Sequence, residues 1–98
     1  MKTITIKKSE LIWDEWNVKH IEKHKVKRSE VKQVLKRKYV ARETYKERVM
    51  IIGTSGDRIL SIVLAKEQKG YYVVTARDAS KKERRIFRNE KNSQIQKL

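Results

Sequence analysis

Three arginines stand at the ends of apolar segments, where arginine is typical of sites that hold phosphate. Arg48 and Arg58 each begin such a segment, and Arg77 directly follows one. Guanidinium suits phosphate because its planar fork donates two parallel hydrogen bonds and keeps its charge. Cations placed beforehand also stabilise the extra negative charge of a phosphoryl-transfer transition state. If the segments pair as strands, we expect the three arginines to converge on one face or rim of a sheet, although solvated strand ends are the ordinary alternative for any one of them.

Arg77 is the strongest of these candidates because a helix begins shortly after it. The segment Ser80-Lys81-Lys82-Glu83 reads as a capping box, in which serine serves the third helical N–H and glutamate reaches back to the cap. The amino terminus of that helix adds positive potential beside Arg77. The box by itself accounts for Glu83. The corner formed by Arg77 and the helix is therefore predicted to face phosphate.

Two histidines and one glutamate are candidates for proton transfer. His20 and His24 are four residues apart, so they lie on adjacent turns of one helix. Histidine titrates near neutral pH, which suits a general acid or base, but a structural role and shared binding of a metal ion are alternatives for this pair. We expect no metal site, because no further carboxylate stands at a telling spacing. Glu47 borders a strand beside Arg48 and is either a base or half of a surface ion pair.

Further basic and aromatic side chains are candidates for contact with unpaired nucleic acid. Cations follow the nucleic-acid backbone, and aromatic rings stack on bases. Tyr71 and Tyr72 point to opposite faces of their strand, so at most one of them is buried. We take Tyr72 as the stacking candidate. The predicted RNA-binding set is Lys66, Lys69, Tyr72, Lys81, Arg84 and Arg85.

The charge of the chain indicates a polyanionic partner. Lysine and arginine number 26 against 12 acidic residues, which gives the 98 residues a net charge of +14. RNA, DNA, an anionic membrane surface and an acidic protein are all compatible with that field. There is no cysteine, which excludes disulfides and thiol nucleophiles. The first residues lack the apolar run of a signal peptide and no segment is long enough to span a membrane, so we expect a cytoplasmic protein.

Apolar periodicity and cap residues predict the elements that position these groups. The expected order is a strand at 3–6, a helix at 15–24 capped by Asp14, a helix capped by Ser29, a weak strand at 39–45, three strands within 48–76, and a helix that opens at Ser80. Short connections between the three apolar strands favour an antiparallel meander. We therefore predict one α+β domain over residues 1–98, with an antiparallel sheet of four to five strands, two N-terminal helices and a C-terminal helix. Its compact part covers about 3–89, and residues 90–98 are expected to fray.

Three segments together resemble BrnT-type toxins, the DUF497 family. They are WDEWNVKHIEKHKV at 13–26, an arginine-led hairpin at 48–60, and VVTARDASKKERRIFR at 73–88. The resemblance implies a compact α+β fold like that of RelE-type toxins and an endoribonuclease that halts translation. It also implies a neutralising antitoxin, BrnA-like, whose ribbon-helix-helix domain brings the complex to operator DNA. The family's glycine after the second histidine is Lys25 here, at a left-handed helix end where lysine costs about 1 kcal/mol.

For such a ribonuclease we predict chemistry without metal or cofactor. The 2′-OH of RNA is the nucleophile, so the site needs a base, cations around the phosphorane and an acid for the leaving 5′-oxygen. The products are a 2′,3′-cyclic phosphate and a 5′-hydroxyl. The alternative is a basic module, such as a degenerate toxin homologue, that binds nucleic acid or protein without chemistry. The candidate catalytic residues are Arg77 on the phosphate, Arg48 and Arg58 in support, and His20, His24 or Glu47 as proton carriers.

Overall fold

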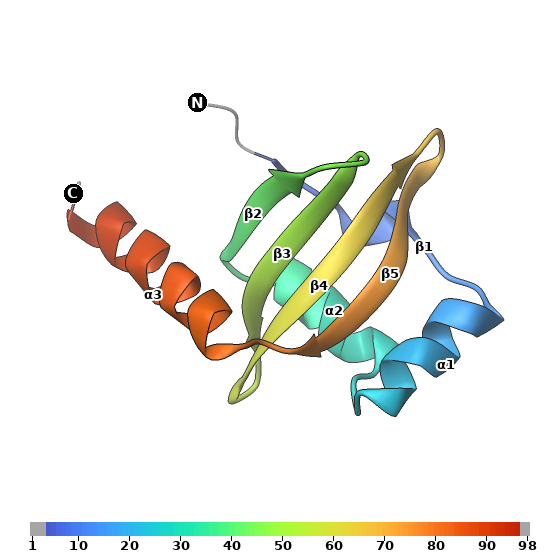
Figure 1. Ribbon diagram of the computed structural model, residues 1–98, viewed down its shortest axis with the longest axis horizontal. Coiled ribbons are helices and arrows are strands. Elements are labelled where there is room, and N and C mark those ends of the chain that lie inside the picture. The colour runs from blue at the N-terminus through green and yellow to red at the C-terminus, as the bar shows by residue number, and fades with distance from the viewer. Residues whose placement is uncertain (1–3, 97–98) are drawn as a thin grey trace.

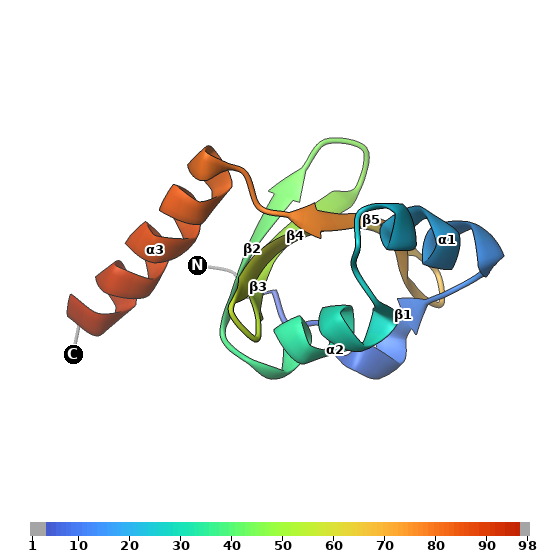
Figure 2. The same ribbon diagram turned by 90° about the horizontal axis from the view of Figure 1, so that it is seen from below.

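The five-stranded sheet at the centre of the molecule separates two helices on one side from a single helix on the other (Figure 1 and Figure 2). The structure, a computed structural model, describes the backbone of residues 4–96 and the side chains of residues 4–90. The predicted α+β class is confirmed. The elements are a 3-10 turn Lys8–Glu10, β1 Leu11–Ile12, α1 Glu15–Lys23, α2 Arg28–Lys36, β2 Tyr39–Thr44, β3 Arg48–Ser55, β4 Arg58–Glu67, β5 Gly70–Asp78 and α3 Lys81–Gln96.

The strands lie in the order β1-β5-β4-β3-β2, and the last four form an antiparallel meander. The short connections predicted it for β3, β4 and β5, and β2 extends it by one strand. β1 differs, because it runs parallel to β5 with Leu11 opposite Tyr71. The sheet is therefore mixed rather than purely antiparallel. The chain passes through both N-terminal helices and the rest of the meander between these two strands, so no hairpin dictates their relative direction.

The strand expected at 3–6 was wrong for the residues that the structure describes, because residues 4–6 have no regular secondary structure. Residue 3 lies outside the described residues. The alternating isoleucines still pack inward: Ile6 is buried, and Ile4 is half-buried against the same core. The backbone N–H of Ile6 donates to the hydroxyl of Tyr39 at 2.9 Å. Burial thus explains the apolar pattern, while a side chain takes the hydrogen bond that a neighbouring strand would have taken.

The helix starts follow local side-chain chemistry. α1 begins as predicted, with Asp14 and Asn17 each accepting the other's backbone N–H at 2.9 Å. The N-cap of α2 is Lys27 rather than Ser29, so the helix begins two residues earlier than expected. The carboxylate of Glu30 instead accepts the backbone N–H of Lys27 at 3.0 Å and so closes the first turn.

Alternate residues of β4 divide the core between the two sides of the sheet. Leu60, Ile62 and Leu64 point toward α1 and α2, and they join the larger buried cluster. A smaller cluster under α3 joins Ile52 to Phe87. α3 covers only the β2–β3 part of its side, which leaves the rest of that side uncovered (Figure 2). We call this uncovered area the open face; its residues include Arg48, Val63, Tyr72, Thr75 and Arg77.

α3 continues through Gln96 and includes much of the polar segment that was expected to fray. Glu90 on this helix forms an ion pair with Arg42 of β2. Fraying of 90–98 stays a prediction, and residues 97–98 lie outside the described residues. Within residues 4–96, no helix is both long and apolar enough to cross a membrane.

Candidate functional site

A β-bulge in β5 decides which side chains reach the open face. Val63 pairs with Thr75 and Leu64 pairs with Val73, so Val74 is the extra residue. Val73 and Ala76 consequently both face the core, although they are three residues apart. Thr75 and Arg77, two residues apart beyond the bulge, then lie together on the open face. A strictly alternating strand would have put Val73, Thr75 and Arg77 on one side.

Arg77 is held by a carboxylate at the corner where β5 meets α3. Its Nη1 and Nη2 atoms donate to the two oxygens of Glu83 at 2.7 and 2.9 Å, and Nη1 also donates to the backbone oxygen of Asp78 at 3.2 Å. The Arg77 side chain keeps 38% of its surface exposed. The guanidinium is thus fixed in direction but still open to solvent on the open face.

Glu83 anchors this arrangement from inside. Besides binding Arg77, its carboxylate accepts the hydroxyl of Ser61 and the backbone N–H of Ser80, both at 2.8 Å. The hydrogen bonds from Arg77 lower the pKa of Glu83 to about 2, against the opposing effect of burial. The capping box itself was correctly predicted, since the hydroxyl of Ser80 accepts the backbone N–H of Glu83 at 3.2 Å. That the same carboxylate holds Arg77 was not predicted from the sequence.

His20 reaches the open face from α1. Its Nε2 atom lies 3.1 Å from the hydroxyl of Thr75, which shares a face of β5 with Arg77. His24 packs edge-on against His20, with ring centroids 5.2 Å apart. Both rings are exposed. The structure therefore brings the predicted proton carrier His20 and the predicted phosphate ligand Arg77 to one strip of sheet. Thr75, which links them, was missed.

Tyr72 lies on the same strip, but its hydroxyl is engaged. It sits 3.0 Å from each carboxylate oxygen of Asp14, at the start of α1. Burial, together with this hydrogen bond, raises the pKa of Tyr72, so the phenol stays neutral and donates to the carboxylate. The contact ties α1 to the edge of β5 and leaves the half-buried ring facing outward beside Thr75.

Arg48 lies on the open face but far from Arg77. It pairs with Ala65 of β4, whereas Arg77 pairs with Ser61, so the two rows are four residues apart, or about 13 Å. The expected convergence of the three arginines is therefore not observed. The antiparallel register causes this, because β3 begins at the end of the sheet where β4 finishes.

Arg58 is turned to the opposite side of the sheet and does not join Arg77. Two positions before buried Leu60, it faces α2, where its Nη1 donates to Glu30 at 3.0 Å and to the backbone oxygen of Lys25 at 2.8 Å. Its Nε donates to Asp78 at 3.1 Å. These contacts tie the connection between the two N-terminal helices to the end of β5. We therefore assign Arg58 a structural role and do not place it in the site of Arg77.

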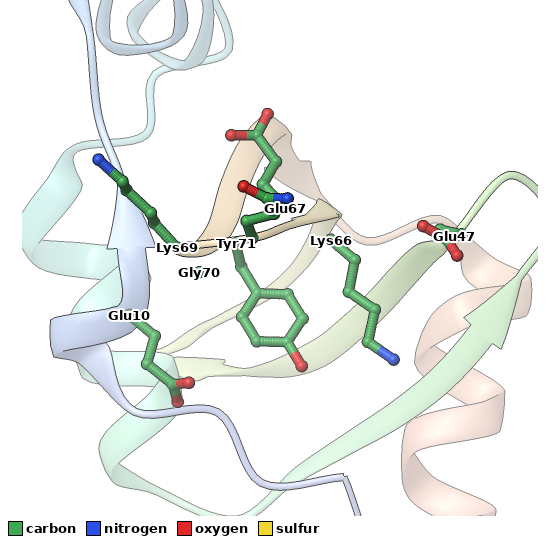
Figure 3. Close-up of a pocket in the computed structure, with 8 residues that line it drawn as sticks. Glu10, Glu47, Lys66, Glu67, Lys69, Gly70 and Tyr71 are labelled. Carbon is green, nitrogen blue, oxygen red and sulfur yellow. The ribbon is translucent and has the colours of Figure 1, made fainter.

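A second group of candidates gathers at the β4–β5 hairpin, around an open pocket (Figure 3). The ring of Tyr71 lies between Glu10 and Lys66, and Glu47 lies beyond Lys66. The predicted proton carrier Glu47 is thus beside Lys66, across the pocket from Lys69, and distant from Arg77 along the strands. Three acidic and two basic side chains line this pocket, so their charges partly offset one another.

α3 carries the remaining predicted RNA-binding cations. Lys81, Arg84 and Arg85 line one stretch of the helix surface together with Arg88. They follow directly on the corner that holds Arg77. Within the described residues, no three histidine, aspartate or glutamate side chains cluster as a metal site.

Comparison with known proteins gives one match. The family model described as "Ribonuclease toxin, BrnT, of type II toxin-antitoxin system" matches residues 13–83. This range contains α1, the whole sheet meander and the Arg77–Glu83 pair. Searches of curated proteins and of solved structures gave no match.

Proposed function

The chain belongs to the family of BrnT ribonuclease toxins of type II toxin–antitoxin systems, and from this premise we propose that it is an endoribonuclease that cleaves RNA without metal and thereby inhibits translation. The observation that carries this proposal is the Arg77–Glu83 pair on an open face that also presents His20. The net charge of +14 favours a polyanionic substrate. RNA needs no external nucleophile, because its own 2′-OH attacks the adjacent phosphorus.

The hydrogen bonds that Arg77 makes do not use the edge of its guanidinium that is suited to phosphate. Of its five N–H donors, two bind Glu83 and a third binds the backbone oxygen of Asp78. Among the described residues, two donors remain, Nε–H and the second hydrogen of Nη2, and they lie side by side on one edge of the fork. That edge donates two parallel hydrogen bonds to two oxygens of a single phosphate. Glu83 thus orients Arg77 without occupying its phosphate-binding edge.

His20 is the proposed proton carrier at this phosphate. It is exposed, and its hydrogen bond to Thr75 directs it over the strand that carries Arg77. His24 lies against it and is placed to carry the second proton. One imidazole takes the proton of the 2′-OH and the other gives a proton to the leaving 5′-oxygen, which yields a 2′,3′-cyclic phosphate and a 5′-hydroxyl. Glu47 lies too far along the sheet to share this task.

The rest of the proposed RNA path follows the exposed cations around the open face. We place flanking phosphates on Arg48 in one direction and on the α3 cations in the other. The predicted cations Lys66 and Lys69 lie at the β4–β5 hairpin, where Lys66 alternates with Leu64 and so points to the side of the sheet away from the open face. In the cell, we propose a cytoplasmic complex with a BrnA-like antitoxin. The antitoxin would supply a ribbon-helix-helix domain that binds operator DNA, while this chain contacts DNA only through it.

The first test is cleavage of a defined RNA in excess EDTA, with analysis of the fragment ends. We expect multiple turnover and cyclic-phosphate and 5′-hydroxyl ends. Arg77→Ala should keep the fold, as judged by circular dichroism, and lose about 10²-fold or more in turnover. Arg77→Lys should recover little, because an ammonium group lacks the planar fork.

The matched control is Lys32→Ala, which removes an exposed cation from α2, on the side of the sheet away from Arg77. This variant should cleave like the wild type. Equal losses in the two alanine variants would refute a specific role for Arg77. RNA that stays intact with folded, antitoxin-free wild type, with or without magnesium or ribosomes, would favour the non-catalytic binding module instead.

A further inference from the structure

Trp16 is a large exposed side chain that neither the core nor the proposed chemistry explains. It is the second residue of α1 and exposes 81% of its surface, although the other tryptophan, Trp13, packs against the core. A large apolar ring held in water by a rigid helix indicates a contact surface. Because the capped helix already orders the backbone, binding of a partner has to order only the side chain.

Two contacts place Trp16 at the border of the open face. Asp14 binds Tyr72 two residues before it, and His20 binds Thr75 four residues after it. Residues four apart on a helix differ by about 40° around its axis, so Trp16 and His20 lie on one side of α1. α1 therefore runs beside β5 with Trp16 next to His20, and the strip continues through Thr75 to Arg77.

Two lysines stand on the Trp16 side of α1. Lys19 and Lys23 stand three and seven residues further along α1, which puts them on the same side of the helix as Trp16, and both are exposed. Glu15 and Glu22 adjoin Lys19, with which they line one hollow, whereas Lys23 lies nearer to Trp16, about 20° around the helix axis. Aromatic rings interleaved with cations are the usual platform for single-stranded nucleic acid, since the rings stack on bases and the cations bind phosphates.

We propose that Trp16 forms a stacking subsite for one unpaired nucleobase of the RNA, a few nucleotides from the phosphate bound by Arg77. This inference rests on the proposed function for its substrate class, but it concerns binding and not the chemical step. Lys19 and Lys23 hold the phosphates that flank the stacked base. The subsite accepts any base with a flat face, and so it contributes affinity and register rather than sequence reading.

The test uses an RNA oligonucleotide with 2′-O-methyl groups, which has no nucleophile and cannot be cleaved. Titration should quench the fluorescence of the wild type and leave that of Trp16→Phe, which retains only Trp13, nearly unchanged. Trp16→Ala should weaken binding by about 5- to 150-fold, and Trp16→Phe should restore most of it because a ring is retained. Tyr45→Ala is the matched control: Tyr45 is also 81% exposed, but it lies in the β2–β3 turn at the other edge of the sheet.

Oligonucleotides with a single abasic position then locate the stacked base. One abasic position should weaken binding to the wild type but not to Trp16→Ala. The subsite would be overturned if Trp16→Ala bound the oligonucleotide as tightly as the wild type does. It would also be overturned if the oligonucleotide did not bind, if it did not quench the fluorescence, or if an antitoxin quenched the fluorescence and RNA did not. Cleavage by the wild type with unchanged affinity in Trp16→Ala would leave the proposed function standing. Quenched binding without cleavage of ordinary RNA would refute the enzyme and keep the subsite.

Discussion

Glu83 performs three tasks with one carboxylate. It closes the first turn of α3, it binds the hydroxyl of Ser61, and it fixes both Nη atoms of Arg77. Its side chain is only 13% exposed, so these contacts replace most of its water. A buried carboxylate of this kind is stable only while its partners are present, which makes the corner of β5 and α3 sensitive to any change in its charge.

Glu83→Gln should therefore lower the free energy of unfolding at neutral pH, by on the order of 2 kcal/mol. The folded-state pKa of Glu83 is about 2, below its ordinary value of 4.5, so its ionised form is favoured by folding. That contribution is fully present above about pH 4.5 and is lost as the pH falls through about 2. Urea unfolding of the wild type and the variant should show a gap at pH 7 that narrows below pH 4.5.

Glu43→Gln is the control, because Glu43 is exposed on β2. Its unfolding midpoint should differ little from that of the wild type at either pH. A gap between Glu83→Gln and the wild type that stays constant from pH 7 to pH 3 would show that the pairing with Arg77 does not determine the stability of this corner.

Single residues could be predicted where a local pattern dictates their surroundings. The capping box and the position of Arg77 at the end of a strand follow from sequence neighbours alone. The separation of Arg58 from Arg77 and the meeting of His20 with Thr75 do not. They depend on strand register and on the bulge at Val74, both of which are set by long-range packing.

The end of α1 shows how an element tolerates an unfavourable residue. Lys25 adopts φ 61°, the left-handed conformation predicted for this position. The backbone N–H groups of Lys25 and Val26 donate to the carbonyls of Glu22 and Ile21 at 2.9 and 3.0 Å, and this pattern is a Schellman motif. Val26 and Ile21 are both fully buried, so the motif carries its usual apolar contact. The buried valine and the bond from Arg58 hold the turn despite the lysine.

Lys25→Gly should stabilise the protein by about 1 kcal/mol, because glycine adopts positive φ without a steric penalty. For a domain of this size the melting temperature should rise by about 4–8 °C. Lys19→Gly is the matched control: the same substitution in the middle of α1 should destabilise by about 1 kcal/mol. A melting temperature that falls in both variants would indicate that the lysine side chain contributes more than its backbone costs.

Elements with strong local signals were predicted well, and those that depend on distant partners were not. The starts of α1 and α3 and the four-stranded meander follow from caps, turns and apolar runs. β1 consists of two residues beside β5, and no periodicity marks so short a strand. The isoleucines of residues 4–6 alternate as a strand would, but they are buried without pairing.

On the scale of the whole molecule, the fold places the basic residues on different surfaces, whereas the composition gives only their number. One group of the 26 basic residues lies on α3, where the basic stretch directly follows the corner at Arg77. α2 also carries exposed cations, on the side of the sheet away from that corner. If RNA follows the open face, the two sets of cations should contribute unequally to binding, although they contribute equally to net charge.

Two triple variants separate these contributions. Replacing Lys81, Arg84 and Arg85 by alanine lowers the net charge from +14 to +11, and so does replacing Arg28, Lys32 and Lys36. Each released counterion adds about 0.7 to the salt dependence of binding to a single strand, so the α3 variant should lose about 2 from the slope of log Kd against log salt. The α2 variant should lose little. Both slopes are measured by fluorescence anisotropy with a non-cleavable oligonucleotide at about 50–300 mM KCl, where salt screens surface charges strongly. Equal losses would mean that RNA responds to the overall field of the molecule and has no fixed path along α3.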